Sequence, residues 1–251
     1  MQKWRPVKRN LLLSGVLSIT AIALSACSGS VYGYESDITS VNQTSWHLWR
    51  GAWLAAGVVG IFTAILILWP VFRHRRKEGD PEYPKQTQYN IPVEVAYTVI
   101  PFIIVAVLFY FTARDESTIT AKEPSKVMHT IDVTGIQWSW QFGYQDGGPK
   151  AVVTGTPAQP PTLVLPQGER IRFNIHSNDV VHGFWIPAFM IQIQNLPGVT
   201  NHLEFTANKL GEYPGRCNIL CGRNHSQMVF KVKVVTPTDY QAYIETIKAG
   251  S

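Results

Sequence analysis

Two long apolar stretches limit what this chain can fold into more than any other feature. Residues 51–71 (GAWLAAGVVGIFTAILILWPV) contain no formal charge over 21 positions, and a helix of that length is about 31 Å long, enough to cross the hydrocarbon core of a bilayer. Residues 91–113 form a second such stretch, with Glu94 as the one acid and Pro101 as a predicted kink. Both are therefore predicted to be transmembrane helices, because a helix satisfies its own backbone in lipid.

The flanking residues predict how these helices are oriented. Three tryptophans crowd the start of the first stretch, as interfacial tryptophans do: Trp46, Trp49 and Trp53. The connecting loop, 73–90, begins with RHRRK and also contains Lys85. Because positively charged loops remain in the cytoplasm, residues 27–113 are predicted to form a hairpin with its loop in the cytoplasm and both of its ends outside the cell. Residues 114–251 then lie on the extracytoplasmic side.

The first 26 residues are predicted to be a signal peptide. MQKWRPVKRN supplies the positive charges, and LLLSGVLSITAIAL is an apolar run too short to span a bilayer comfortably. The following LSAC resembles the lipobox of bacterial lipoproteins, which implies acylation of Cys27. The alternative is an ordinary cleavage site beside a free cysteine.

The charge balance excludes a nucleic-acid partner. Net charge is +5, but four of the 22 basic residues lie in the first nine positions, leaving 18 basic against 17 acidic residues without that end. No basic footprint for nucleic acid remains. Residues 114–251 are nearly neutral, so long-range steering of a charged partner is expected to be weak.

Beyond Arg114 the chain reads as one β-rich domain. Short strand-like runs such as HTIDVTGIQWSWQF, PTLVLPQGERIRFNIHS and MVFKVKVV are separated by glycine, proline and asparagine. This spacing predicts an antiparallel β-sandwich or barrel. The end, PTDYQAYIETIKAG, predicts a helix with Thr238 as its N-cap. Its predicted apolar face consists of Tyr240, Tyr243, Ile244 and Ile247.

The segment CNILCGRNHSQM, residues 217–228, carries the clearest chemical signal. In an oxidising compartment two nearby cysteines usually form a disulfide. A disulfide between Cys217 and Cys221 does not explain why His225 and Met228 follow so closely. Thiolate, thioether and imidazole together are the ligand set that suits copper.

A second histidine is needed to complete such a site. Mononuclear blue copper uses two histidines, one cysteine and a weak methionine. His182, in NDVVHGFWIP, is the best upstream candidate because it follows a β run in an apolar stretch, whereas His176 and His202 are less well placed. Cys217 is then one thiolate too many for a single ion. A second copper, bridged by both thiolates, accounts for it and favours electron transfer.

These features together resemble a known family. The pattern CxxxCGxNHxxM, the upstream VHGFWIP and the helical hairpin resemble subunit II of bacterial haem-copper cytochrome c oxidases. The resemblance implies an α+β membrane protein in the bacterial plasma membrane, with a multi-pass, two-helix hairpin followed by an extracytoplasmic cupredoxin-like β-sandwich or barrel. It implies electron transfer from cytochrome c through a binuclear copper centre, CuA, to haem in subunit I. There a further copper assists the reduction of oxygen to water, coupled to proton pumping.

The resemblance also implies roles for individual residues. The six implied copper ligands are His182, Cys217, the backbone carbonyl of Ile219, Cys221, His225 and Met228. In this family the two cysteines bridge both coppers, and each histidine binds one. Trp138, in QWSWQFGY, would receive the electron from cytochrome c, while the other aromatic residues of that segment are expected in the core. Glu94 would lie at the mouth of a proton path into subunit I; a carboxylate hydrated at the membrane interface is the alternative.

Several positions depart from the family pattern. The family usually has glutamate at the position of Ile219, where its carboxylate binds magnesium or manganese at the subunit I interface. Isoleucine keeps the carbonyl for copper and removes the support for that second metal, and Gln194 and Val199 weaken the same interface. Gly143 replaces a common donor-docking acid, which leaves Asp179 as the clearer acidic candidate. A tethered or fused cytochrome c donor is therefore expected.

Three other copper or oxidase proteins are alternatives. A metallochaperone of the Sco type also has CxxxC and a distant histidine, but on a thioredoxin fold and without the NHxxM continuation. Subunit II of a quinol oxidase has the same architecture without copper ligands. Nitrous oxide reductase carries a similar copper domain after a large propeller, for which 251 residues leave no room.

Overall fold

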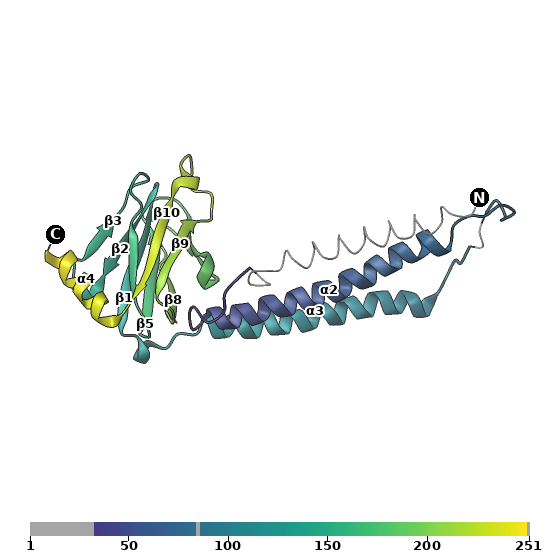
Figure 1. Ribbon diagram of the computed structural model, residues 1–251, viewed down its shortest axis with the longest axis horizontal. Helices are drawn as coiled ribbons and strands as arrows, with labels where there is room; N and C mark the ends of the chain where they lie inside the picture. Colours follow the sequence, from purple (N-terminus) through teal and green to yellow (C-terminus); the bar gives the residue numbers. More distant parts are fainter. Residues whose placement is uncertain (1–32, 84–85, 250–251) are drawn as a thin grey trace, which may run out of the picture. The chain divides into compact units, whose positions relative to one another are not determined.

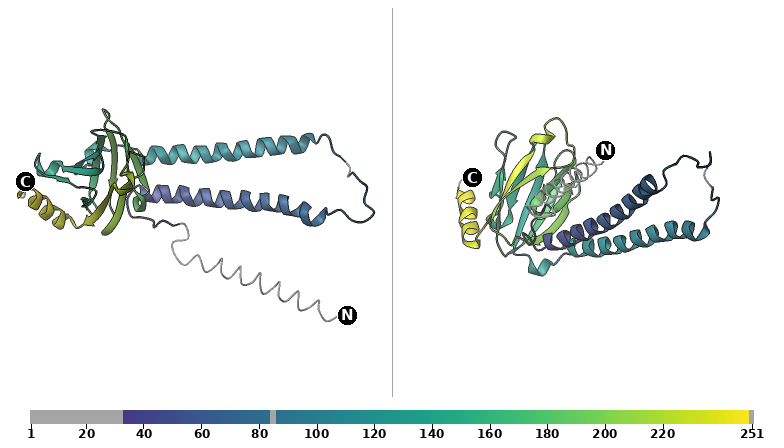
Figure 2. Two further views of the ribbon diagram at one scale, coloured as in Figure 1. Left: turned by 90° about the horizontal axis from the view of Figure 1, so that it is seen from above. Right: turned by 45° about the vertical axis from the view of Figure 1, so that its right-hand side comes forward.

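The computed structural model describes residues 33–83 and 86–249. The predicted signal peptide and Cys27 lie outside the described residues. The predicted membrane spans lie within two long helices, α2 (Asn42–Arg73) and α3 (Ile91–Ile119), which run side by side and are joined by a loop (Figures 1 and 2). Each is long and apolar enough to cross a membrane. The second helix continues through Pro101.

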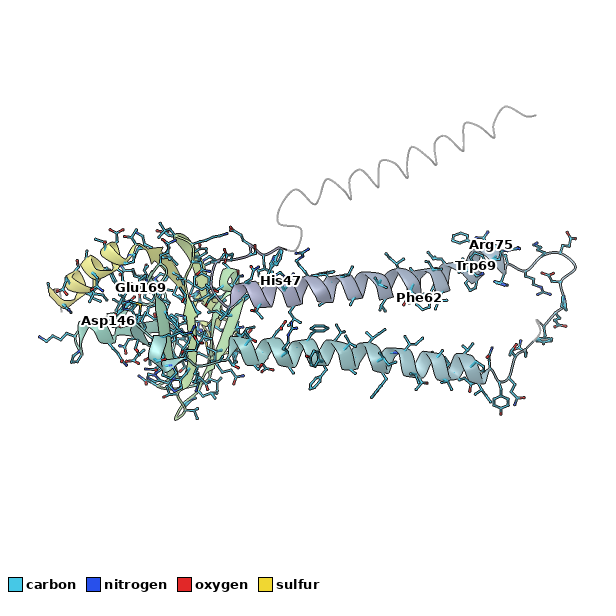
Figure 3. The ribbon with its side chains drawn as sticks, turned by 90° about the horizontal axis from the view of Figure 1, so that it is seen from below. His47, Phe62, Trp69, Arg75, Asp146 and Glu169 are labelled. Atoms are coloured by element: carbon cyan, nitrogen blue, oxygen red, sulfur yellow. The ribbon has the colours of Figure 1, made fainter. Side chains whose placement is uncertain are left out.

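The surface of the hairpin is apolar on all sides. Large side chains such as Phe62 and Trp69 project from α2 (Figure 3) and are 60% exposed in both cases. A helix that is apolar all round needs an apolar environment, which lipid supplies. Two apolar helices followed by a β-sandwich are the predicted fold, although the pairing of the strands is not purely antiparallel.

Ten strands form the sandwich (Figure 1). The first sheet, in spatial order, contains β3 (Val152–Thr154), β2 (Ser139–Tyr144), β1 (His129–Ile136), β5 (Arg170–Ser177) and β8 (Asn201–Thr206). The second contains β4 (Thr162–Pro166), β10 (Val229–Val235), β9 (Gly211–Cys217), β6 (His182–Ile186) and β7 (Ile191–Asn195). The pairs β1–β5 and β4–β10 are parallel. Alternating burial indicates a strand but not its direction, so sequence could not reveal these two pairs.

Aromatic side chains fill the space between the sheets. Phe184 of β6 and Phe230 of β10 stack with ring centroids 5.0 Å apart. Trp140 of β2, in the opposite sheet, packs edge-on against Phe230 with ring centroids 5.3 Å apart. Trp140, Phe142 and Tyr144 are all buried, as expected for core residues of QWSWQFGY. This packing fixes the strands that carry the candidate ligands.

The C-terminal helix, α4 (Pro237–Ala249), begins earlier than predicted. The prediction that Thr238 is the N-cap is wrong, because Thr236 is the residue that caps the helix. The Thr236 hydroxyl accepts from the Asp239 N–H at 3.2 Å and donates to its carboxylate at 2.8 Å. Proline suits the first helical position because it has no N–H to satisfy.

A short segment before α2 packs into the β domain. Ile38 and Val41 are buried in its core, and the Ser40 N–H donates to the Thr206 carbonyl at 2.9 Å. The sequence patterns had grouped these residues with the hairpin. The core of the β domain therefore includes residues from both sides of the hairpin.

Candidate metal centre

The segment 217–228 connects two paired strands. Cys217 is the last residue of β9, and β10 begins directly after Met228. Val229 lies opposite Arg216, and the Cys217 N–H donates to the Met228 carbonyl at 2.9 Å. The strand pairing thus brings both ends of the segment together and folds the residues between them into a closed loop.

The loop gathers four side chains and one carbonyl. The Cys221 sulfur lies 3.8 Å from the Cys217 sulfur, 3.5 Å from His225 Nδ1 and 3.7 Å from the Met228 sulfur. The Ile219 carbonyl oxygen is 3.2 Å from the Cys217 sulfur. A disulfide bond is about 2.05 Å long. Cys217 and Cys221 are therefore free, buried thiols.

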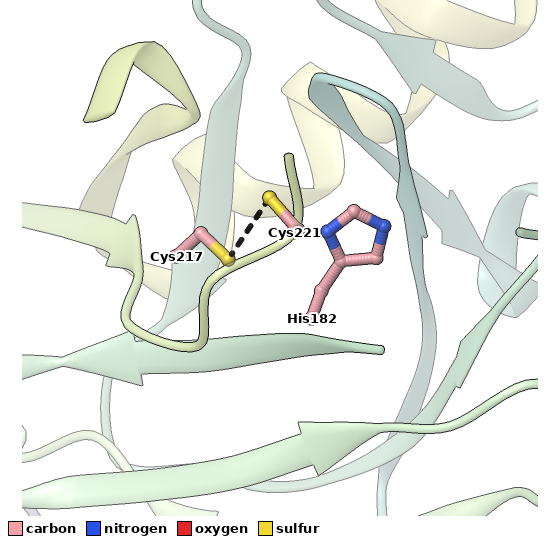
Figure 4. Close-up of side chains that lie close together, drawn as sticks. All are labelled: His182, Cys217 and Cys221. Atoms are coloured by element: carbon pink, nitrogen blue, oxygen red, sulfur yellow. Dashed lines mark hydrogen bonds between the residues drawn. The ribbon is translucent and has the colours of Figure 1, made fainter. Parts of the chain in front are cut away.

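His182 reaches the same place from β6, the strand beside β9. Its side chain is fully buried, and Nε2 lies 2.8 Å from an Asp179 carboxylate oxygen. Nδ1 has no hydrogen-bond partner among the described residues. Ligand atoms of His182, Cys217 and Cys221 all lie within 4.8 Å of one another (Figure 4). A buried imidazole nitrogen without a partner beside two thiols is what a metal ion would satisfy.

The two thiols differ in acidity. Burial raises the pKa of Cys217, but the adjacent His182 ring and the Gly183 N–H outweigh it and lower this pKa to about 6. Burial and the negative charge on Cys217 raise the pKa of Cys221 to about 12. One thiolate therefore forms readily in the metal-free cluster, and metal binding would release the second proton.

The candidate electron-entry residue lies against this loop. Trp138 is half-buried in the β1–β2 turn, and its indole N–H donates to the Cys221 carbonyl at 3.3 Å. The Gln137 side-chain amide donates to the same carbonyl at 2.8 Å. Sequence reasoning did not single out Gln137, since nothing in its own neighbourhood connects it to a residue 84 positions away.

Asp179, the candidate donor-docking acid, is exposed, and both of its carboxylate oxygens also accept hydrogen bonds. One carboxylate oxygen accepts from the Val180 N–H and faces His182, and the other accepts from the Gln137 N–H at 2.6 Å. Burial opposes ionisation, but these hydrogen bonds lower the pKa of Asp179. Asp179 therefore orients a candidate ligand. A carboxylate three residues before the histidine was the signal available in the sequence.

The remaining candidate residues differ in burial and in their hydrogen-bond partners. Glu94 is in the first turn of α3, where its carboxylate accepts from the Asn90 N–H at 3.1 Å and so helps to cap the helix. Gln194 and Val199 are exposed, and Ile219 is half-buried beside the exposed Leu220. His202 is exposed as well, and His176 contacts Thr134 at 3.1 Å.

Comparison with known proteins identifies close relatives. Residues 158–235 match the family model for the periplasmic domain of cytochrome c oxidase subunit II. The chain is 36% identical over 286 residues to probable cytochrome c oxidase subunit 2 of Streptomyces coelicolor, covering 97% of this chain and 88% of that protein. Cytochrome c oxidase subunit 2 of Mycobacterium tuberculosis is 35% identical over 300 residues, which cover 94% of this chain and 81% of that protein.

A solved structure is also similar. The crystal structure of the periplasmic domain of subunit II of cytochrome oxidase from Bradyrhizobium japonicum shares 31% sequence identity with this chain. The alignment covers 50% of this chain and 96% of that one, with a TM-score of 0.44.

The family prediction is confirmed by these relatives and by the observed fold. The β-sandwich excludes the thioredoxin fold of the metallochaperone alternative. Identity of 36% over nearly the whole of the chain extends through the hairpin as well as the β domain. This chain belongs to the family of cytochrome c oxidase subunit II.

Proposed function

We propose that this chain is the electron-entry subunit of a cytochrome c oxidase and that it holds the binuclear copper centre CuA. The observation that carries the proposal is the buried cluster of two free thiols and His182, whose Nδ1 has no hydrogen-bond partner in the described part of the chain. The cluster offers soft sulfur and imidazole donors, which copper prefers. When bound, the copper pair would take up and release one electron at a time.

Each ligand would have a distinct task. Cys217 and Cys221 would bridge the two ions, because their sulfurs lie side by side in the loop. His182 and His225 would each bind one ion through Nδ1. In His182 this atom has no partner among residues 33–83 and 86–249, and in His225 it faces the Cys221 sulfur. Met228 and the Ile219 carbonyl would complete the two sites more weakly. Neighbouring strands of one sheet, β6, β9 and β10, hold these donors, which keeps the ligands in place between redox states.

Trp138 would be the point where electrons enter. Its ring is partly exposed, and its N–H contacts the carbonyl of a ligand residue. The donor would be cytochrome c, tethered or membrane-bound, because the domain carries little net charge to steer a soluble one. Electrons would then pass to haem in subunit I, for oxygen reduction coupled to proton pumping. Ile219 cannot supply the carboxylate for an interfacial magnesium or manganese ion.

The hairpin would place this domain outside the plasma membrane, with residues 1–26 removed and Cys27 acylated. Glu94 would mark the proton-path entrance at the cytoplasmic end of α3. Its carboxylate accepts a hydrogen bond from the Asn90 N–H. Glu94→Gln is expected to slow turnover of the assembled oxidase without changing copper content. Full turnover would leave Glu94 with its capping role alone.

Electron entry tests the proposal directly. In the assembled oxidase, Trp138→Phe is expected to slow reduction of the copper centre by reduced cytochrome c and to leave the copper spectrum unchanged. Trp185→Phe is the matched control, because Trp185 is also half-buried but lies in β6. Equal rates for the wild type and Trp138→Phe would remove Trp138 from the path.

A further inference from the structure

The two-residue turn between β1 and β2 is tied to both sides of the candidate metal centre. The main-chain N–H of Gln137 donates to an Asp179 oxygen at 2.6 Å. The other oxygen of the same carboxylate lies 2.8 Å from His182 Nε2. One chain of hydrogen bonds therefore runs from the turn to the ligand that comes from β6.

A second connection runs from the same residue to the loop. The Gln137 side-chain amide donates to the Cys221 carbonyl at 2.8 Å, and the Trp138 indole donates to that oxygen at 3.3 Å. A carbonyl oxygen has two lone pairs, so these two donors satisfy it. Gln137 makes the shorter contact. Its amide therefore holds the carbonyl more firmly than the indole does.

The residue after Cys221 leaves room for both donors. Gly222 has a φ of +122°, and a Cβ atom there would lie 3.0 Å from the Trp138 indole nitrogen and 3.1 Å from the Gln137 amide nitrogen. A side chain at this position would push both donors away from the carbonyl. Glycine at position 222 thus allows the close contact between the turn and the loop, and it also adopts the positive φ that the backbone has there.

We propose that Gln137 is a positioning residue for electron entry. Its amide fixes the Cys221 carbonyl, and this keeps the neighbouring Trp138 ring in contact with the loop. Its main-chain N–H fixes Asp179, which in turn orients His182. Gln137 forms and breaks no bond during the reaction; a single electron passes from the donor by way of Trp138. The inference rests on the proposed roles of Trp138 and the copper centre.

Gln137→Met tests this role because methionine has a similar length and no donor. A neutral hydrogen bond is worth a factor of roughly three to ten. In the assembled oxidase, the rate of copper reduction at saturating cytochrome c is expected to fall by about that factor. Copper content and the cytochrome c concentration for half-saturation are expected to stay unchanged. The matched control is Gln141→Met in β2, whose amide donates to Thr154 at 2.9 Å and does not reach the loop.

A second measurement does not depend on copper. In the metal-free full chain labelled with ¹⁵N at tryptophan, Trp138→Phe identifies the Trp138 indole signal. Gln137→Met is expected to speed exchange of this N–H with solvent by roughly three- to tenfold, whereas Gln141→Met leaves it unchanged. This measurement decides the matter even if Gln137→Met loses copper. Unchanged exchange in Gln137→Met would overturn the inference.

The failure of this inference can be distinguished from the failure of the proposed function. If Trp138→Phe slows electron entry but Gln137→Met alters neither the entry rate nor the indole exchange, only the role of Gln137 is wrong. If the wild-type chain binds no copper pair, the proposed function fails. An altered indole exchange would then still show that Gln137 positions Trp138.

Discussion

Two buried histidines at separate places in the β domain differ in how their rings are satisfied. His129, at the start of β1, contacts a carboxylate through each ring nitrogen: Asp146 at 2.5 Å and Glu169 at 2.7 Å. Both acids lie at the same end of the sandwich (Figure 3). His182 has one such contact, to Asp179, and its other nitrogen has no partner within the described part of the chain.

This difference separates a structural histidine from a candidate ligand. Tyr240 of α4 donates to the same Asp146 oxygen at 3.0 Å and packs its ring edge-on against His129 at 4.9 Å. The His129 cluster thus fastens the C-terminal helix to the sheet. Both rings are buried, so burial alone does not identify the ligand. The unsatisfied nitrogen does, because a buried polar atom without a partner is costly.

The largest expected effect comes from removing the unsatisfied histidine. His182→Asn should reduce copper from two ions per chain to one or none, because the ligand atom is lost. Even changes around a ligand cost roughly 10- to 100-fold in metal affinity. Metal analysis of the full-length protein measures this. His202→Gln is the control, since His202 is exposed and contacts Asn174. Two coppers per chain in His182→Asn would show that His182 is not a copper ligand.

Removing the satisfied histidine should have the opposite outcome. His129→Asn leaves Asp146 and Glu169 without their shared partner and is expected to lower the free energy of unfolding by about 3 kcal/mol. Copper content should stay at the wild-type value. Thermal unfolding of the full-length protein, with metal analysis on the same sample, tests both parts. Loss of copper would show that the two clusters are not independent.

A smaller effect is expected at the carboxylate that orients His182. Asp179→Asn keeps the shape of the side chain but replaces one of its acceptor oxygens with an amide group. Copper affinity should fall by roughly tenfold to hundredfold, as for other partners of metal-binding histidines. A competition titration with a copper chelator measures it. Asp132→Asn, a carboxylate of β1 that contacts Gln145 and Asn174, should leave the affinity unchanged.

The smallest expected effect is a pH dependence that belongs to His129. Burial lowers the pKa of His129, but the hydrogen bonds and charges of Asp146 and Glu169 outweigh it and raise the pKa above its usual value. The stabilisation is therefore complete below the unfolded pKa of about 6.5 and is lost as pH rises through the folded pKa. Tyr240 also faces this ring and remains neutral, because its pKa is raised by burial.

In the copper-loaded protein the unfolding temperature should therefore fall as the pH rises above about 6.5. The His129→Asn variant should lack this part of the dependence. The protein is loaded with copper because the metal-free His182 also has a raised pKa and would add a pH dependence of the same direction. If the unfolding temperatures of the wild type and His129→Asn changed with pH in parallel, the pH dependence would not come from His129.

Local patterns in the sequence predicted much of the molecule. The hairpin follows from composition, since lipid requires apolar side chains along the whole helix. Cys217, Cys221, His225 and Met228 follow from their closeness in the chain. His182 could be selected because it begins a strand in an apolar stretch. Each of these predictions needed only a short window of sequence.

Contacts between distant residues could not be predicted in this way. Gln137 and Cys221 are 84 positions apart, and His129 and Glu169 are 40 apart. Their approach depends on the order of the strands, including the parallel pairing of β1 with β5. The addition of Ile38 and Val41 to the core likewise depends on both sides of the hairpin meeting in space. The residues that support the centre were therefore visible only in the structure.

The proposed function depends on Cys217 and Cys221 together holding two copper ions. The most direct test is electron paramagnetic resonance of the full-length, copper-loaded protein together with its copper-to-protein ratio. We expect two coppers per chain and one unpaired electron shared equally between them. A single copper per chain, or a disulfide between Cys217 and Cys221 in the loaded protein, would contradict it.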